Sequence, residues 1–228
     1  MRLKILTGVV LAILISGTLQ AQFSLGINVK VQDPTGDFNH NVHKAAAGIS
    51  FTGIHRKVDS RFSWGGELGI AMYSNENYLY DLSEDGYPGE FVEVSEEDCF
   101  WTLHALARYH IWEKENVKTY AEGRLGVTTF FSSRTALDDH YDIDDNFDSH
   151  GTAFNTGLGA GLAFNPKGVL SKDTSGRLWI ELGATYMTGT KANYRHISES
   201  ASGLSLSEGQ YRSLTHYMDY RLGFVFSL

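Results

Sequence analysis

The feature that most constrains the fold of this chain is the stretch Tyr217–Leu228, in which every second residue is large and apolar. The apolar positions are Tyr220, Leu222, Phe224, Phe226 and Leu228. A period of two residues predicts a β-strand, because successive side chains of a strand point to opposite faces. The opposite face carries Asp219 and Arg221. This strand therefore needs an apolar medium on one side and water or ion pairs on the other.

Seven further segments alternate in the same way. The eight predicted strands are 22–31, 45–57, 61–73, 98–112, 117–131, 151–164, 177–188 and 211–228. Each is long enough to cross a bilayer obliquely, which takes about 9–11 residues. The connections after the second, fourth and sixth strands are shorter than the other four. This alternation of turns and long loops predicts an all-β fold, an eight-stranded antiparallel up-and-down transmembrane β-barrel.

The two faces of the predicted strands differ sharply in composition. The residues of the apolar parity that we assign to the outside of the barrel carry no charge. That parity includes Phe23, Leu25, Ile27, Ile49, Phe51, Trp64, Leu68, Leu103, Tyr109, Leu125, Phe131, Leu158, Leu182 and Tyr186. A soluble lipocalin-like barrel would place this parity inside and would have an unusually glycine-rich surface. The apolar last strand and the asymmetry of the loops favour lipid outside.

The beginning of the chain has the pattern of a secretory signal. Arg2 and Lys4 precede an apolar run, Ile5–Leu19, and a small residue, Ala21, follows. This order predicts a signal peptide over residues 1–21, cleaved after Ala21, and a barrel domain over residues 22–228. The run is short for a single transmembrane anchor and lacks stop-transfer charges. A lone cysteine, Cys99, allows no disulfide within the chain.

Composition excludes several classes of function. Mean hydropathy is −0.22, which excludes a helical membrane bundle. The 19 Lys and Arg face 27 Asp and Glu. Without Arg2 and Lys4 of the leader, the net charge changes from −8 to −10, so we expect no nucleic-acid partner.

Charges of both signs share the inward parity. Those that we predict to form an ion-paired network in the lumen are Glu67, Arg108, Glu122, Arg124, Glu181, Asp219 and Arg221. If the hairpin register places Glu113 opposite Val117, then Arg108 lies opposite Glu122. An eight-stranded barrel is only wide enough to be filled by side chains. Because an unpaired charge there is costly, we expect a plugged lumen, with His104 and His110 as hydrogen-bond partners and no metal.

Other patterns in the sequence indicate a binding site less strongly. Asp142, Asp144 and Asn146 have the alternate spacing of a calcium loop but lack the glycine and glutamate of an EF-hand, so a solvated acidic loop is favoured. We expect the glycines of 157–161 to make room for bulky side chains across the lumen. No zinc, CxxC or Walker pattern occurs, and no cofactor is expected.

One pair of residues has the order of a nucleophile and its base. His196 and Ser198 are similar to the His-x-Ser pair of outer-membrane lipid A deacylases, in which a carboxylate orients the histidine. Glu199 or Glu208 would be the third member. We place the pair in a loop beyond the seventh strand, where nothing fixes the geometry, so we expect no enzyme and no catalytic residue.

Leader, alternation, loop asymmetry and last strand together resemble the small outer-membrane β-barrel family of the outer membrane protein A transmembrane-domain type. The resemblance implies a monomer in the cell outer membrane, with outer-membrane lipid and the barrel-insertion machinery as partners. It carries over no residue-specific motif, and it leaves the extracellular ligand open. The sequence thus predicts a structural or surface-interaction protein; a lipid A-modifying hydrolase and a narrow porin are the alternatives.

Overall fold

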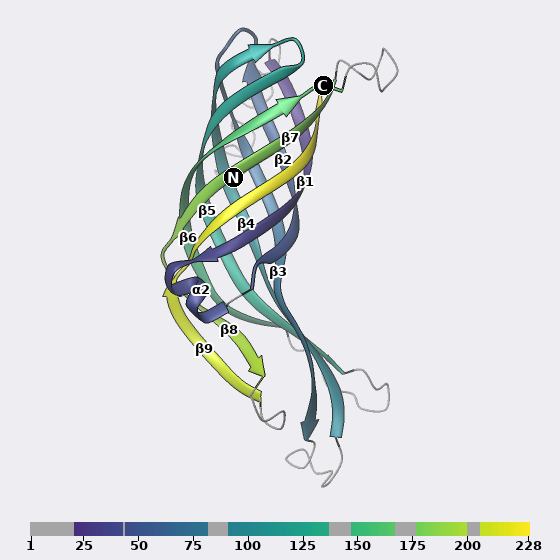
Figure 1. The fold of residues 1–228 in the computed structure, drawn as a ribbon, viewed down its shortest axis with the longest axis vertical. Coiled ribbons are helices and arrows are strands. Elements are labelled where there is room, and N and C mark those ends of the chain that lie inside the picture. Colours follow the sequence, from purple (N-terminus) through teal and green to yellow (C-terminus); the bar gives the residue numbers. More distant parts are fainter. Residues whose placement is uncertain (1–20, 43, 82–90, 137–146, 167–176, 200–205) are drawn as a thin grey trace, which may run out of the picture.

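The computed structural model describes residues 21–42, 44–81, 91–136, 147–166, 177–199 and 206–228. Eight strands close into an antiparallel barrel (Figure 1). They are β1 (Ala21–Thr35), β2 (Ala46–Lys57), β3 (Phe62–Asp81), β4 (Phe91–Lys114), β5 (Val117–Ala136), β6 (Phe147–Phe164), β7 (Leu178–Gly189) and β10 (His216–Ser227). Each strand pairs with its neighbour along the chain except where β7 pairs with β10, and β1 with β10 closes the barrel. The predicted all-β, eight-stranded up-and-down barrel is confirmed.

Closure leaves the barrel without a free sheet edge through its middle. β1 and β10 pair continuously from Ser24 opposite Ser227 to Thr35 opposite His216. An unpaired strand edge would expose backbone N–H and C=O groups, which lipid cannot hydrogen-bond. The described residues contain no helix that is both long and apolar enough to cross a membrane.

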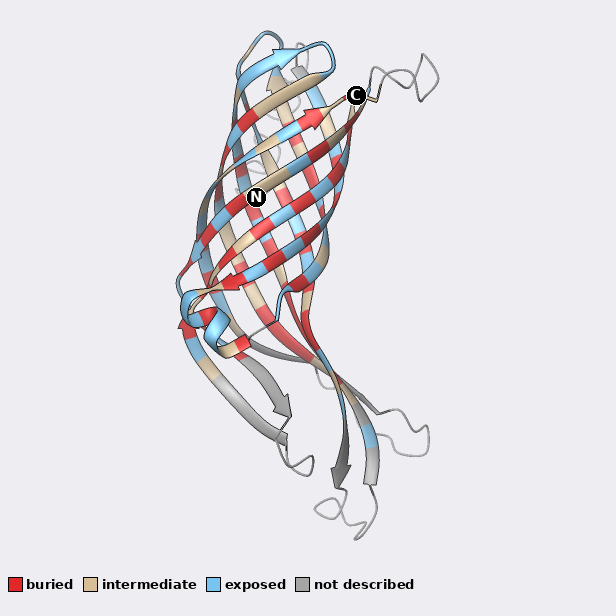
Figure 2. Cartoon of the chain, in the orientation of Figure 1, coloured by how far each residue is buried: buried red, intermediate tan, exposed pale blue. Residues whose placement is uncertain are grey.

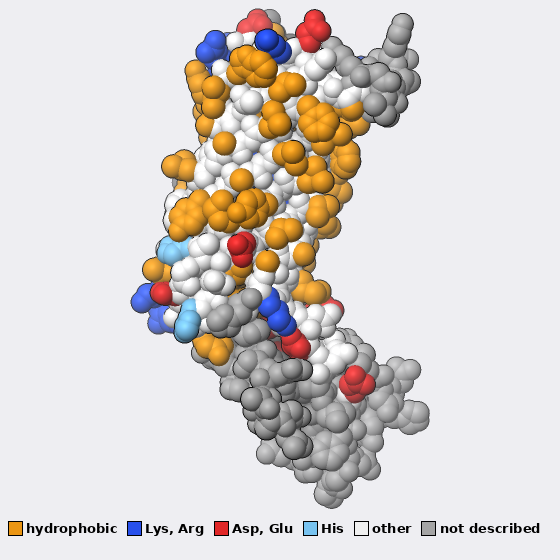
Figure 3. All heavy atoms as spheres, in the orientation of Figure 1, with side chains coloured by type: hydrophobic (Ala, Val, Ile, Leu, Met, Phe, Trp, Pro, Cys, Tyr) orange, Lys and Arg blue, Asp and Glu red, His pale blue; other side chains and the backbone are white. Residues whose placement is uncertain are grey.

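The alternation of the sequence appears directly as alternating burial along each strand (Figure 2). On β1, Leu25 and Ile27 are exposed on the outside, whereas Asn28 and Lys30 are buried in the lumen. The exposed apolar side chains form a belt around the barrel wall, visible on one face in Figure 3. This belt is the surface that a β-barrel presents to lipid.

On the loop side, five strands (β1, β3, β4, β5 and β6) extend four or more residues beyond their predicted ends. The pairing of β3 with β4 continues beyond Met72 opposite Cys99 as far as Asp81 opposite Phe91. Register shifts interrupt the ladders near this end, between Met72 and Ser74 and between Phe130 and Phe131. One assignment is wrong: Phe131, predicted to be exposed on the outside, is buried. Its partner on β4, Cys99, is buried as well, so the outward parity of β4 and β5 is not exposed at this level.

Two loops on this side contain regular structure that the sequence analysis missed. α2 (Gly36–Val42) is a short helix between β1 and β2. β8 (Lys191–Glu199) and β9 (Leu206–Leu214) form a separate two-stranded ribbon between β7 and β10. The predicted last strand, 211–228, was therefore wrong at its start, where residues 211–214 belong to β9 and the barrel strand begins at His216.

The turn between β4 and β5 also differs from the prediction. Lys114, not Glu113, lies opposite Val117. A register shift between His110 and Trp112 then restores the expected pairing, and Arg108 lies opposite Glu122. The predicted register of the turn was wrong by one residue. The bulge shifts the pairing back by one residue, so the predicted pair of Arg108 and Glu122 is present.

Candidate functional site

The middle of the lumen holds eight charged side chains, four of each sign. The cations are Lys30, Arg108, Arg124 and Arg221, and the carboxylates are Glu67, Glu122, Glu181 and Asp219. They come from β1, β3, β4, β5, β7 and β10, and every one is buried. Each lies on the inward parity of its strand, because the outward parity is taken by the apolar belt. Their formal charges cancel.

Glu122 is the hub of the network. Its Oε2 accepts a hydrogen bond from Arg108 Nε at 2.5 Å, and its Oε1 accepts one from Arg124 Nε at 2.6 Å. Arg221 donates to both oxygens, at 2.8 and 2.7 Å. One carboxylate thus meets three guanidinium groups. Planar guanidinium donors match carboxylate oxygens in a fixed fork, so these bonds fix the side chains in place.

A second set of ion pairs extends the network toward the loop side. Lys30 Nζ lies 2.8 Å from Glu67 Oε1 and 2.8 Å from Asp219 Oδ2. Arg124 joins this set to the hub, because its Nη1 lies 2.5 Å from Asp219 Oδ2 and 3.3 Å from Glu67 Oε1. The His104 ring nitrogen Nδ1 lies 3.8 Å from Glu67 Oε1. The four carboxylates are therefore bridged by cations without a break.

Tyr120 links the network on the turn side. Its hydroxyl donates to Glu181 Oε1 at 2.5 Å and accepts from Arg221 Nη2 at 3.0 Å. Arg108 binds both oxygens of Glu181, at 3.1 and 2.8 Å, and its guanidinium carbon lies 4.5 Å from the Tyr120 ring centroid. The phenol ring occupies space left by Gly161, its partner on β6, where an added Cβ would overlap the ring. That glycine makes room for a neighbour on the adjacent strand, not for a side chain across the lumen.

An aromatic cluster closes the lumen on the loop side of the network. Its buried side chains include Phe38, Val42, Tyr73, Phe100, Phe130 and Tyr194. Phe38 comes from α2, and its ring centroid lies 5.8 Å from that of Phe130 and 5.1 Å from that of Tyr194, both in edge-to-face geometry. Such aromatic pairs are worth about 0.5–1.5 kcal/mol beyond their buried area. The short helix is thus held over the barrel mouth by its apolar face.

The β8–β9 ribbon contributes to the same seal. Tyr194 of β8 accepts a hydrogen bond at its hydroxyl from Asn41 Nδ2 at 2.7 Å, and the hydroxyl lies 2.8 Å from Ser213 Oγ of β9. Burial raises the pKa of the Tyr194 hydroxyl. Gly151 of β6 lets the ribbon approach closely, because an added Cβ would lie 2.7 Å from the Asn193 carbonyl oxygen. Helix, ribbon and barrel wall therefore meet at one aromatic cluster.

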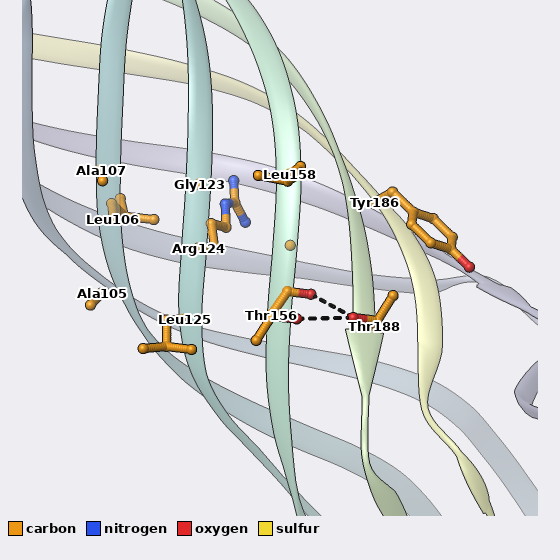
Figure 4. Close-up of a pocket in the computed structure, with 11 residues that line it drawn as sticks. Ala105, Leu106, Ala107, Gly123, Arg124, Leu125, Thr156, Leu158, Tyr186 and Thr188 are labelled. Carbon is orange, nitrogen blue, oxygen red and sulfur yellow. Dashed lines mark hydrogen bonds between the residues drawn. The ribbon is translucent and has the colours of Figure 1, made fainter.

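The outer wall of β4–β7 has a shallow recess (Figure 4). Small residues on the outward parity, Ala105, Ala107 and Gly123, line it beside Leu125 and Leu158. Thr156 and Thr188 lie at one side, with their hydroxyls 3.0 Å apart. The two hydroxyls are hydrogen-bond partners, and a polar group in an apolar belt is costly without such a partner. The recess is part of the lipid-facing surface.

The structure places all seven sequence-predicted network residues inside the barrel and brings them into one connected set. Lys30 belongs to the set although the predicted network omitted it; its inward parity on β1 was the available signal. His110, expected as a hydrogen-bond partner, lies 3.1 Å from Ser63 Oγ through its Nε2. The aromatic cluster had only one sequence signal, the i, i+4 spacing of Phe38 and Val42 in a short segment.

The remaining candidates fall elsewhere. His196 and Ser198 lie on β8, opposite Gly209 and Ser207, so their expected position in a loop was wrong. The two-stranded ribbon was missed because the small polar residues that follow Ser198 are typical of a loop. Asp142, Asp144 and Asn146 lie outside the described residues. Within the described ranges, no group of three or more His, Cys, Asp or Glu side chains is arranged to hold a metal ion.

No protein-family model matches the sequence, and no curated protein matches it. Solved structures do match. A major outer membrane protein from Thermus thermophilus is 14% identical with a TM-score of 0.55, covering 91% of this chain and 99% of that one. Neisserial surface protein A (11% identical, TM-score 0.47) and the attachment invasion locus protein Ail of Yersinia pestis (14%, 0.42) match over 91% of this chain and 96% and 97% of theirs. The chain has the fold of the small outer-membrane β-barrels.

Proposed function

We propose that this protein is a non-conducting barrel of the outer membrane with a structural or surface-interaction role. The observation that carries the proposal is the filled lumen. Eight charged side chains form a connected ion-pair network in the middle of the barrel, and an aromatic cluster lies over the loop-side mouth. A pore needs a continuous wet path, and a neutral, hydrogen-bonded set of side chains opposes one. The rigid wall then serves to hold the loops in place.

The loop-side strands support a surface role. β3, β4 and β5 run beyond the level at which β2 ends, and β4 stays paired with β5 as far as Val94 opposite Ala136. A sheet extension therefore projects from the barrel (Figure 1). The Ser74–Glu97 segment of the sequence is rich in Glu and Asp. A negatively charged rim of this kind selects cationic partners and repels anionic ones. We infer that the extension presents the acidic segment to molecules outside the cell.

The test compares cells with and without the protein. We expect equal influx of small hydrophilic solutes, because the barrel adds no path, and labelling of loop-side cysteines introduced at Lys44 or Glu97 by a membrane-impermeant reagent on intact cells. A cysteine introduced at Lys57, on the turn side, is the matched control and stays unlabelled until the outer membrane is broken. Faster solute influx in cells with the protein would favour the narrow-porin alternative instead.

The processing of the chain is a separate part of the proposal. Cleavage after Ala21 gives a mature protein that begins at Gln22, and the apolar last strand is the segment that the barrel-insertion machinery reads. We expect a monomer that fractionates with outer membranes, with Gln22 found by N-terminal sequencing. Mature protein in the soluble periplasm would contradict this part.

A second candidate, a lipid A-modifying hydrolase, keeps one observation in its favour. His196 and Ser198 lie on one strand, β8, two residues apart. A serine becomes a nucleophile only when a positioned base takes its proton. We expect no loss of lipid A acyl chains, by mass spectrometry, on expression of the protein. Deacylation that disappears in both His196→Ala and Ser198→Ala would establish the enzyme.

A further inference from the structure

The turn-side end of the lumen holds a small, partly open cavity of about 70 Å³. All eight barrel strands contribute lining residues, so the cavity is a vestibule at the centre of the barrel. Its inner boundary is the ion-pair network, through Arg108, Tyr120 and Glu181. A single water occupies at least about 10–15 Å³ by the same kind of measure. The vestibule therefore has room for a few waters or for one small ion with part of its hydration shell.

The walls of this vestibule carry more positive than negative charge. The charged lining residues are Arg56, Arg108, Lys118 and Glu181. Arg108 and Glu181 bind each other, with Arg108 Nη2 2.8 Å from Glu181 Oε1. Arg56 is matched by Glu113, because its Nη1 and Nη2 donate to the two carboxylate oxygens at 2.5 and 2.8 Å. Of these charged lining residues, Lys118 is the one whose charge is not matched by one of these two ion pairs.

Lys118 lies opposite Glu113 in the β4–β5 ladder, yet that carboxylate is already engaged. Besides Arg56, His110 Nδ1 lies 3.2 Å from Glu113 Oε1. The Lys118 ammonium instead lies 4.0 Å from the centroid of the Trp179 ring, a cation–π contact, and among the described residues it has no ion-pair partner. An aromatic face satisfies one side of an ammonium that has three N–H donors. Donors remain for a ligand in the vestibule.

We propose that the vestibule binds one small monovalent anion, chloride or an ion of similar size, at the Lys118 ammonium. The charged side chains deeper in the lumen cancel, and the Arg56 charge is cancelled by Glu113, so Lys118 supplies the net side-chain charge that the anion neutralises. A half-enclosed site of low dielectric strengthens that attraction relative to water. Trp179, which is 8% exposed, forms the apolar side of the site. This site is independent of the proposed surface role.

The contact between Lys118 and Trp179 supplies the test. The experiment uses purified protein in detergent in which Trp64→Phe, Trp101→Phe and Trp112→Phe leave Trp179 as the single tryptophan. Iodide, which quenches tryptophan fluorescence, is added in place of a bulky organic anion so that the ionic strength stays constant. We expect quenching that saturates with iodide concentration, and recovery of emission when chloride competes. Quenching that rises linearly and ignores chloride means collisions or water only, and it overturns the proposal.

Variants of Lys118 and Lys114 distinguish loss of anion binding from loss of folding. Lys118→Met keeps the length of the side chain without its charge, and we expect the apparent iodide affinity to fall by about tenfold or more, as expected for loss of a charge-assisted contact. Lys118→Arg keeps the charge and retains saturable quenching. Lys114→Met, which removes a cation at the exposed turn, is the matched control and leaves the affinity unchanged. If Lys118→Met does not fold, anomalous diffraction from bromide-soaked crystals of the unsubstituted protein decides: a peak beside Lys118 Nζ supports the site, and none refutes it.

Discussion

The substitution that examines the lumen network most sharply is Glu122→Gln. It keeps the shape of the side chain but removes a negative charge that contacts Arg108, Arg124 and Arg221 at 2.5–2.8 Å. Three guanidinium groups lose their shared carboxylate, and the lumen is left with four cations and three carboxylates. Breaking a buried ion pair by removing one partner costs about 3–5 kcal/mol, because the remaining charge is buried without compensation. We expect the free energy of unfolding to fall by about that amount.

The assay is urea unfolding of the protein in lipid vesicles, followed by tryptophan fluorescence. Glu113→Gln is the matched control, because it breaks the ion pair with Arg56 at the exposed turn, where the Glu113 side chain is 31% exposed. Such surface pairs contribute about 0–1 kcal/mol. Adding Arg221→Met to Glu122→Gln restores a neutral lumen and should recover part of the loss. A Glu122→Gln cost no larger than that of Glu113→Gln would refute the network as a source of stability.

Three further predictions test other parts of the fold. Leu222→Arg places a charge in the lipid-facing belt at a cost of about 2–4 kcal/mol near the bilayer middle, so we expect failed membrane insertion, whereas Leu222→Ala inserts; normal assembly of the arginine variant would show that the outward parity is wrong. Gly161→Ala introduces a Cβ that overlaps Tyr120 and should lower the urea midpoint, whereas Gly123→Ala, whose Cβ would meet only Leu158 at 3.9 Å, should not; equal midpoints would refute the close contact. Phe38→Ala removes a buried aromatic side chain, a change worth about 3–5 kcal/mol in a core, and should make the α2 segment susceptible to proteolysis while the barrel stays folded; the exposed His40→Ala is the control, and unchanged protection of α2 would contradict the seal.

The barrel was predictable from sequence because lipid imposes a strict rule on alternate residues. Phe224 and Leu222 on one parity and Asp219 and Arg221 on the other are enough to fix both faces of β10. The pairing of Arg108 with Glu122 followed from parity and an approximate turn, although a bulge beyond the turn was needed to make it right. The parity of β1 also places Lys30 on the inward face, although the predicted network did not include it.

The mouth of the barrel was not predictable in the same way. Phe38 and Val42 form one turn of a seven-residue helix, too short to show a helical period. Tyr194 lies on a ribbon that is bounded by small polar residues and is held by contacts with α2 and β6, which no local pattern reveals. Phe131 keeps the outward parity of β5 but is buried together with its partner Cys99, so alternation alone did not predict its exposure. Tertiary contacts, not local alternation, determine this region.

Recording ion currents through purified protein in planar bilayers at neutral pH shows whether charged side chains fill and close the lumen. A filled lumen conducts almost no current, so we expect a nearly silent membrane for the unsubstituted protein and for Lys57→Gln, which alters only an exposed charge near the turn. Large, stable channels in the unsubstituted protein would contradict the closed lumen and establish the narrow-porin alternative.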